Sequence, residues 1–213
     1  MEIIHRIRVS NQDQVPLPSY ADCLALMEAH GMLPNIREHS YRVMQVADQL
    51  GQALVEAGFE LRLPLISTGA LLHDLGKTAC LGTANNHAQC GADILASLGY
   101  PELALVVAEH VRLDDEVLDP RPLRESEVVN YADKRVLHDR VVTLADRFAD
   151  LQVRYGRTPS ARARIAAMEA KSLVLEEKLF APIPLNPLDL LQANCFQQSA
   201  FSGQPKPANV EGR

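Results

Sequence analysis

The sequence predicts an all-α protein, built as a single helical bundle with terminal extensions. Apolar residues recur at helical spacing in successive segments between residues 19 and 180. Ser, Asn or Thr precedes several of these segments, and proline often stands at or near the first helical position. Glycine follows several of them, where it can end a helix. The sequence contains no clear second domain and no internal repeat.

Length and composition agree with one domain. The chain has 213 residues, of which 47% are hydrophobic, and this is enough for a sizeable core. We predict an N-terminal extension over residues 1–18, a helical domain over 19–180 and a proline-containing C-terminal tail over 181–213. Within the extension, apolar residues alternate with charged ones over residues 3–9, which predicts a short edge strand.

Capping residues begin the first two predicted helices. Ser19 and Asp22 resemble a capping box, so we expect a helix over residues 20–30. A second cap is expected at Asn35, and the apolar periodicity behind it continues to Gly58. The two helices are therefore separated by only a short turn.

The third predicted helix is nearly all apolar and is therefore expected to be buried. Pro64 suits its first turn, and the helix ends before Gly76. His73 and Asp74 then lie at its buried end. Residues 76–86 are predicted to form a loop.

Two further helices are predicted over residues 87–98 and 101–113. A glycine separates them, and Pro101 begins the second one. His87 opens the first of these helices, and His110 lies near the end of the second.

The C-terminal part of the domain is also predicted to be helical. A polar, proline-containing segment over residues 114–124 precedes a helical stretch that starts near Ser126 and leads to Asp133. A longer helix is expected from there to about Tyr155. The last predicted helix, over residues 159–180, is amphipathic and rich in strong helix formers.

Composition argues against several classes of partner. The formal net charge is -6, from 21 Lys and Arg against 27 Asp and Glu, so neither nucleic acid nor an anionic membrane is attracted in general. No stretch approaches the roughly 20 apolar residues that span a bilayer, and we expect a cytoplasmic protein. The four cysteines are widely spaced, without a Cys-x-x-Cys pair, and are expected to be reduced thiols.

Histidine and carboxylate side chains suggest a metal centre that keeps positions open for water and substrate. Asp74 is informative because a carboxylate at the end of an apolar helix is costly to bury unless it is paired or bound to a cation. A single His-Asp pair is weak evidence, and the argument depends on an ordered set. That set is His39, His73, Asp74, His87, His110 and Asp133.

The segments that carry this set are GALLHDLGK at 69–77, NHAQCGADILASLG at 86–99, VVAEHVR at 106–112 and VVNYADKR at 128–135. In this order they resemble the HD-domain superfamily of phosphohydrolases, and the resemblance covers about residues 35–155. It implies that the ligands of a mononuclear site are His39, His73, Asp74 and Asp133. The dinuclear branch of the superfamily adds two histidines, which fall on His87 and His110.

For that branch, the resemblance implies that Asp74 bridges two metal ions and that metal-activated water or hydroxide is the nucleophile. The ions are expected to be divalent or mixed-valence, such as iron or manganese. Lys77 resembles a family lysine that contacts substrate phosphate, so Asp74 and Lys77 are the expected catalytic residues. Arg112 and Lys134, each next to an expected ligand, are further candidates for substrate contact. The histidines without a place in the pattern are expected to be structural: His5, His30 and His138.

These expectations favour a metal-dependent phosphohydrolase that acts on a phosphoester or phosphoanhydride of a nucleotide or similar small metabolite. Two alternatives stay open. The same ligands around mixed-valence iron serve oxygenases of the superfamily, and other HD domains are non-catalytic binding or sensor modules. Nucleic-acid cleavage is disfavoured because no basic stripe accompanies the domain. The sequence does not indicate the substrate, the metal or the oligomeric state.

Overall fold

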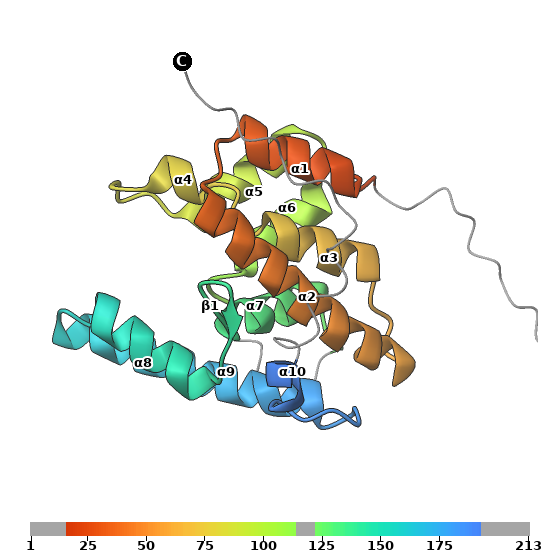
Figure 1. Ribbon diagram of the computed structural model, residues 1–213, viewed down its shortest axis with the longest axis vertical. Coiled ribbons are helices and arrows are strands. Elements are labelled where there is room, and N and C mark those ends of the chain that lie inside the picture. The colour runs from red at the N-terminus through yellow and green to blue at the C-terminus, as the bar shows by residue number, and fades with distance from the viewer. Residues whose placement is uncertain (1–15, 114–121, 193–213) are drawn as a thin grey trace, which may run out of the picture.

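The computed structural model describes residues 16–113 and 122–192, whose regular secondary structure is almost all helix (Figure 1). The helices are α1 (Tyr20–Ala29), α2 (Pro34–Glu56), α3 (Leu63–Leu72), α4 (Lys77–Cys80), α5 (His87–Ser97), α6 (Pro101–Glu109), α7 (Glu125–Lys134), α8 (Leu144–Tyr155), α9 (Pro159–Phe180) and α10 (Asp189–Gln192). In this part of the chain, the sheet is one antiparallel hairpin of β1 (Val136–Leu137) and β2 (Arg140–Val141). The all-α prediction is confirmed. The strand predicted over residues 3–9 and most of the polar segment, residues 114–121, lie outside the described residues.

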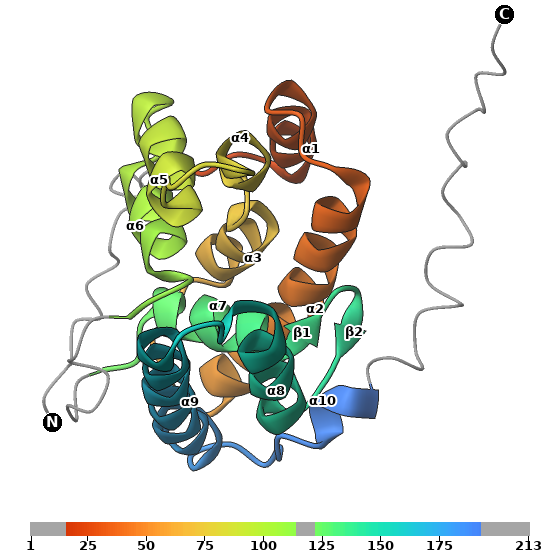
Figure 2. The same cartoon turned by 90° about the vertical axis from the view of Figure 1, so that its left-hand side faces the viewer.

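Helix α3 lies at the centre of the bundle because nearly all of its side chains are apolar. It packs against α2, α6 and α7, which surround it (Figure 2). Gly69 allows α6 to come close, since a Cβ at this position would lie 2.6 Å from Val106 Cγ1. His73 and Asp74 follow the last turn of α3 directly, and both are buried with it.

Helices α8 and α9 pack side by side, and α9 also contacts α7 (Figure 2). Arg135, which is buried after α7, joins these parts of the fold. Its Nε donates to the carbonyl oxygen of Val142 at 2.7 Å, and its Nη2 donates to that of Pro187 at 2.7 Å. Helix α8 also lines the pocket that contains Asp74, after α3, and Asp133 of α7.

The helical stretch expected from near Ser126 to Asp133 is α7, but the longer helix expected to follow it directly to about Tyr155 begins later, at Leu144. Helix α7 ends at Lys134, and the β1-β2 hairpin reverses the chain before α8 begins. At the turn of this hairpin His138 has a positive φ of 58°, a conformation that does not occur inside a helix. Thr143 caps α8 by accepting a hydrogen bond from the backbone amide of Asp146, a Thr-x-x-Asp pattern that marks a new helix start.

Other helix ends also differ from expectation. Residues 76–86 contain the short helix α4 as well as a loop. The second helix begins at Pro34, with Leu33 as its N-cap and no side-chain cap, so the cap expected at Asn35 is absent. Helix α6 ends at Glu109, and His110 is its C-cap. The capping box of Ser19 is confirmed. Among the described residues, no helix combines the length and the apolarity needed to cross a membrane.

Candidate metal centre

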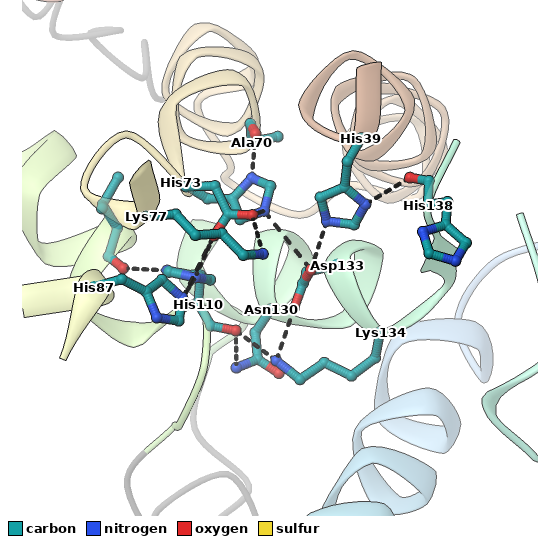
Figure 3. Close-up of polar contacts among 12 residues, drawn as sticks. His39, Ala70, His73, Lys77, His87, His110, Asn130, Asp133, Lys134 and His138 are labelled. Carbon is teal, nitrogen blue, oxygen red and sulfur yellow. Dashed lines mark hydrogen bonds and ion pairs between the residues drawn. The ribbon is translucent and has the colours of Figure 1, made fainter. Parts of the chain in front are cut away.

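The six expected ligands lie close together, and Figure 3 labels all of them except Asp74. Four separate parts of the chain supply the residues around Asp74. They are α2 with His39, the ends of α5 and α6 with His87 and His110, and α7 with Asp133. Most of the set lines a pocket of about 330 Å³, while His73 lies behind it and is fully buried.

The Asp74 carboxylate lies between two groups of nitrogen atoms. Its Oδ1 is 3.4 Å from His87 Nε2 and 3.6 Å from His110 Nε2. Its Oδ2 is 3.4 Å from His73 Nε2 and 2.6 Å from the Lys77 ammonium. One carboxylate thus presents one oxygen to each of two neighbouring positions, which suits a bridging ligand.

Asp133 completes the first of these two positions. Its Oδ1 lies 3.0 Å from His39 Nε2 and 3.7 Å from His73 Nε2. With the Oδ2 of Asp74, these atoms converge on one point from α2, α3 and α7. Two sets within the described residues are close enough to hold a cation, and both contain Asp74: His39, His73 and Asp74, and Asp74, His87 and His110.

Backbone carbonyl groups orient three of the histidine rings. The Nδ1 atom of His39 lies 2.8 Å from the carbonyl oxygen of His138, and those of His73 and His110 lie 2.7 Å and 2.6 Å from carbonyl oxygens three residues before them. A carbonyl oxygen only accepts, so each Nδ1 carries the hydrogen. In the neutral ring, Nε2 then carries no hydrogen, and its lone pair is directed into the site. A metal-binding histidine requires this arrangement.

The site has several acceptors that face one another. His73 Nε2 is buried without a hydrogen-bond partner. His39 Nε2 faces a carboxylate oxygen at 3.0 Å, and two such acceptors repel unless a proton or a cation lies between them. These donor atoms therefore fit bound cations.

The second position has matching dimensions. The Nε2 atoms of His87 and His110 are 3.2 Å apart. Two nitrogens at about 2.1 Å from one metal ion are separated by about 3.0 to 3.4 Å at octahedral or tetrahedral angles. The two imidazoles are therefore spaced as neighbouring ligands of a single ion.

Electrostatics keep both carboxylates ionised. Burial would raise the pKa of Asp74, but the neighbouring His73, His110 and Lys77 hold that pKa well below its usual range. For Asp133, burial is likewise outweighed by Lys134 and its histidine neighbours, and the pKa also lies well below the usual range. Ionised carboxylates are the form that binds a cation.

Two groups at the pocket mouth respond differently to their surroundings. Burial lowers the pKa of His87 to about 4, against the attraction of Asp74, so the ring is neutral at physiological pH. For Lys77, burial opposes the charge, but Asp74 raises the pKa of the ammonium. Lys77 therefore remains a cation, and its half-exposed side chain reaches the pocket.

Helix α8 adds two cations to this pocket that sequence reasoning missed. Arg147 and Arg154 line it together with Leu151. The spacing i, i+4, i+7 places these three residues on one face of α8, which is the pattern that could have revealed them. Arg147 Nε is buried without a hydrogen-bond partner, so the pocket wall retains a donor for an anion.

The other two residues expected at the substrate lie differently. Lys134 lines the pocket, but its ammonium is buried, donates to the carbonyl oxygen of His110 at 2.5 Å and lies 3.3 Å from Asp133 Oδ2. Arg112 is exposed and lines a neighbouring cavity. Arg112 is not part of the lining of the pocket that contains the histidines.

Two supporting residues had no sequence signal. The His138 carbonyl orients His39, although His138 itself lies outside the ligand pattern in the sequence. Asn130 donates through Nδ2 to the carbonyl oxygens of Glu109 and His110, at 2.8 Å and 2.9 Å. Both contacts use backbone atoms, which carry no residue-specific information, so only the fold reveals them.

The fold and this cluster define an all-helical protein with a metal-type His and Asp site. The chain belongs to the HD domain family, which it matches over residues 36–151. That family consists mostly of metal-dependent phosphohydrolases. A relative in Methanocaldococcus jannaschii, an uncharacterised protein, is 29% identical over 143 residues, which cover 62% of this chain and 83% of the relative. No solved structure matches the chain.

Proposed function

We propose that this protein is a metal-dependent phosphohydrolase that cleaves a phosphoester or phosphoanhydride of a nucleotide or similar small metabolite. The observation that carries the proposal is the position of Asp74. Its two oxygens face two nitrogen groups, and the ammonium of Lys77 lies 2.6 Å from one of them. A cation beside a bridging carboxylate suits a substrate that carries negative charge.

The ligand assignment follows from the two groups. The proposed ligands of the first ion are His39, His73, Asp74 and Asp133, and those of the second are Asp74, His87 and His110. When bound, two divalent ions supply Lewis-acid polarisation of a phosphoryl oxygen and lower the pKa of water. The carbonyl-bound histidines hold their Nε2 atoms in place.

The wall of the pocket supports binding of an anion. Lys77, Arg147 and Arg154 line it on the side of α4 and α8. Arg154 already shares its charge with Asp150 at 2.9 Å, and Arg147 lies 3.6 Å from the same residue. Lys77 is therefore the cation best placed to turn from Asp74 to a substrate phosphate, because its own carboxylate partner would be engaged by metal.

The test uses protein purified without oxygen and loaded with Mn²⁺ or Fe²⁺. Phosphate release is measured on a panel of monoesters, diesters, nucleoside polyphosphates and pyrophosphate. We expect release from at least one class, its loss on chelation and its recovery when metal is restored. Lack of phosphate release from every class by a protein with filled metal sites would refute the proposal.

The oxygenase alternative predicts a different result in the same protein. An iron-loaded sample that consumes oxygen with an organic substrate and releases no phosphate would replace the hydrolase by that alternative. A sample that binds nucleotide tightly and turns nothing over would favour a sensor module.

A further inference from the structure

A second cavity, of about 550 Å³, adjoins the candidate metal pocket. The two share part of their lining, namely Val111, Leu151, Tyr155 and Met168. One molecule can therefore occupy both, with a phosphate among the histidines and the rest of its structure between α8 and α9. Both volumes lie in or near the range of about 300 to 1,000 Å³ that is common for small-molecule sites.

The lining of this cavity is mostly apolar. Leu113, Ile165 and Leu175 are buried side chains of its wall, and Met168 is partly buried. Such a surface gains free energy when it covers an apolar group and excludes water. The cavity therefore favours an apolar body in the ligand.

Its buried polar side chains are already engaged. Asn130 uses Nδ2 for the carbonyl oxygens of Glu109 and His110, and Ser172 Oγ donates to the carbonyl oxygen of Met168 at 3.0 Å. A nucleobase would lose hydrogen bonds to water and gain few from this wall. An alkyl or aromatic group has no such loss.

The exposed cations of the lining are two arginines. Arg112 and Arg164 both line the cavity and are exposed. Within residues 16–113 and 122–192, neither has a hydrogen bond or an ion pair through its guanidinium. Two guanidinium groups at the edge of an apolar cavity complement a ligand with a negative charge on its outer end.

We propose that the substrate is a phosphate compound whose organic part has an extended apolar body and a second anionic group. This inference rests on the proposed phosphohydrolase function and narrows its substrate class. The phosphate would lie at the metal pocket, the apolar body in the α8-α9 cavity, and the second anion beside Arg112 and Arg164. The remote contacts are the same in the ground state and the transition state, so they act on binding.

The experiment measures binding of n-alkylphosphonates, from ethyl to octyl, to the Mn²⁺-loaded protein by calorimetry. These probes cannot be hydrolysed, so the result does not depend on which ester the enzyme cleaves. We expect Kd to fall by up to about fourfold for each methylene that becomes buried, until the chain fills the cavity. A terminal carboxylate on the octyl chain should lower Kd further.

Matched variants locate the effect. Ala167 lines the cavity, so Ala167→Phe narrows it. Ala166 is an exposed neighbour that is not part of the lining, so Ala166→Phe is the control. We expect Ala167→Phe to abolish the chain-length dependence and to leave ethylphosphonate binding unchanged, while Ala166→Phe retains both. The double change Arg112→Ala with Arg164→Ala should remove only the preference for a terminal carboxylate, and Arg157→Ala serves as its control.

The outcomes separate the two proposals. Ethylphosphonate that binds with a Kd independent of chain length overturns this inference alone. So does a nucleoside monophosphate that binds more tightly than every alkylphosphonate. If the metal-filled protein binds no phosphonate and also releases no phosphate from any panel compound, the phosphohydrolase function itself is rejected.

Discussion

The ammonium of Lys134 donates a hydrogen bond to the backbone carbonyl oxygen of His110 at 2.5 Å. This contact joins the C-terminal end of α6 to α7, and Asn130 on α7 donates to the same oxygen. Helix α7 therefore supplies Asp133 to one half of the candidate centre and positions His110 in the other half. Burial lowers the pKa of Lys134, while Asp133 opposes that change.

The first prediction concerns this joining contact. Lys134→Met keeps the length of the side chain but removes its donor, so the end of α6 retains only Asn130. We expect the ion at His87 and His110 to be lost, while the ion beside Asp133 is retained because a competing ammonium is gone. Elemental analysis of the purified protein then gives a lower metal content than wild type, without complete loss.

Lys178→Met is the matched control for this variant. Lys178 also binds a buried group, Glu127, at 2.7 Å, but it is not part of the candidate centre. Both variants should lower the free energy of unfolding by about 1 to 3 kcal/mol, since each removes a charged hydrogen bond to a buried polar group. Equal metal loss in both variants would show that Lys134→Met loses metal only because the whole fold is less stable.

A second prediction separates the two carboxylates. Asp74→Ala removes the group that faces both positions, so we expect loss of bound metal and of all phosphate release. Asp133→Ala removes a ligand of the first position only, and part of the metal should remain at the second. Wild-type metal content and turnover in Asp74→Ala would disprove the metal centre.

Gly76 provides a third prediction, because it allows α5 to approach the end of α3. A Cβ at Gly76 would lie 2.5 Å from the carbonyl oxygen of His87 and 2.6 Å from the backbone nitrogen of Gly91. Backbone atoms cannot turn aside, so Gly76→Ala should move His87 away from Asp74. We expect a loss of stability of about 1 to 3 kcal/mol and weaker binding of the second metal.

Gly82→Ala tests whether backbone strain alone has this effect. Gly82 has a positive φ of 74°, but a Cβ there meets nothing within 4 Å. This variant should lose about 1 kcal/mol of stability through strain and keep its metal. Thermal unfolding and elemental analysis measure the two effects. Metal loss in the control as well would contradict the role assigned to Gly76.

Lys77 is the subject of the fourth prediction. Lys77→Ala should lower kcat/KM by about tenfold or more, the size expected for a lost charged hydrogen bond to phosphate. Metal content should be unchanged or higher, because the ammonium no longer competes for Asp74. Lys77→Arg keeps the charge and should recover part of the activity. Unchanged turnover in Lys77→Ala would make this lysine a bystander, and loss of metal would make it structural.

The fifth prediction concerns Cys23, far from the site in the sequence. Burial, together with the charge of Asp22, raises the pKa of its thiol from 9.0 to about 12. Alkylation of the native protein at pH 8 should therefore spare Cys23 and label the half-exposed Cys90 before it. Peptide mass spectrometry measures this order, and rapid labelling of Cys23 would show that α1 opens readily.

The same shift has a defined effect on stability. Below about pH 9 the thiol is protonated in both states, so it has no effect on the free energy of unfolding. Between about pH 9 and about pH 12 only the unfolded state loses the proton, and this group then lowers stability as the pH rises.

Most helices could be predicted because their signals are local. Ser19 and Thr158 cap helices that the structure contains, and Pro101 begins α6. The β1-β2 hairpin escaped prediction because its strands are two residues each and have no periodicity to detect. Its consequence is functional, since the His138 carbonyl that orients His39 lies in its turn.

The sequence by itself determined the helical class, the family and the identity of the candidate ligands. These depend on residue types and on their order, which the chain carries directly. Only the tertiary structure decided how Asp74 divides its oxygens between two nitrogen groups, where Arg147 enters the pocket, and that Lys134 binds a carbonyl oxygen. It also decided that Arg112 belongs to a neighbouring cavity. These properties depend on distances between segments far apart in the chain and on backbone carbonyl groups, and neither is encoded in any local pattern of side chains.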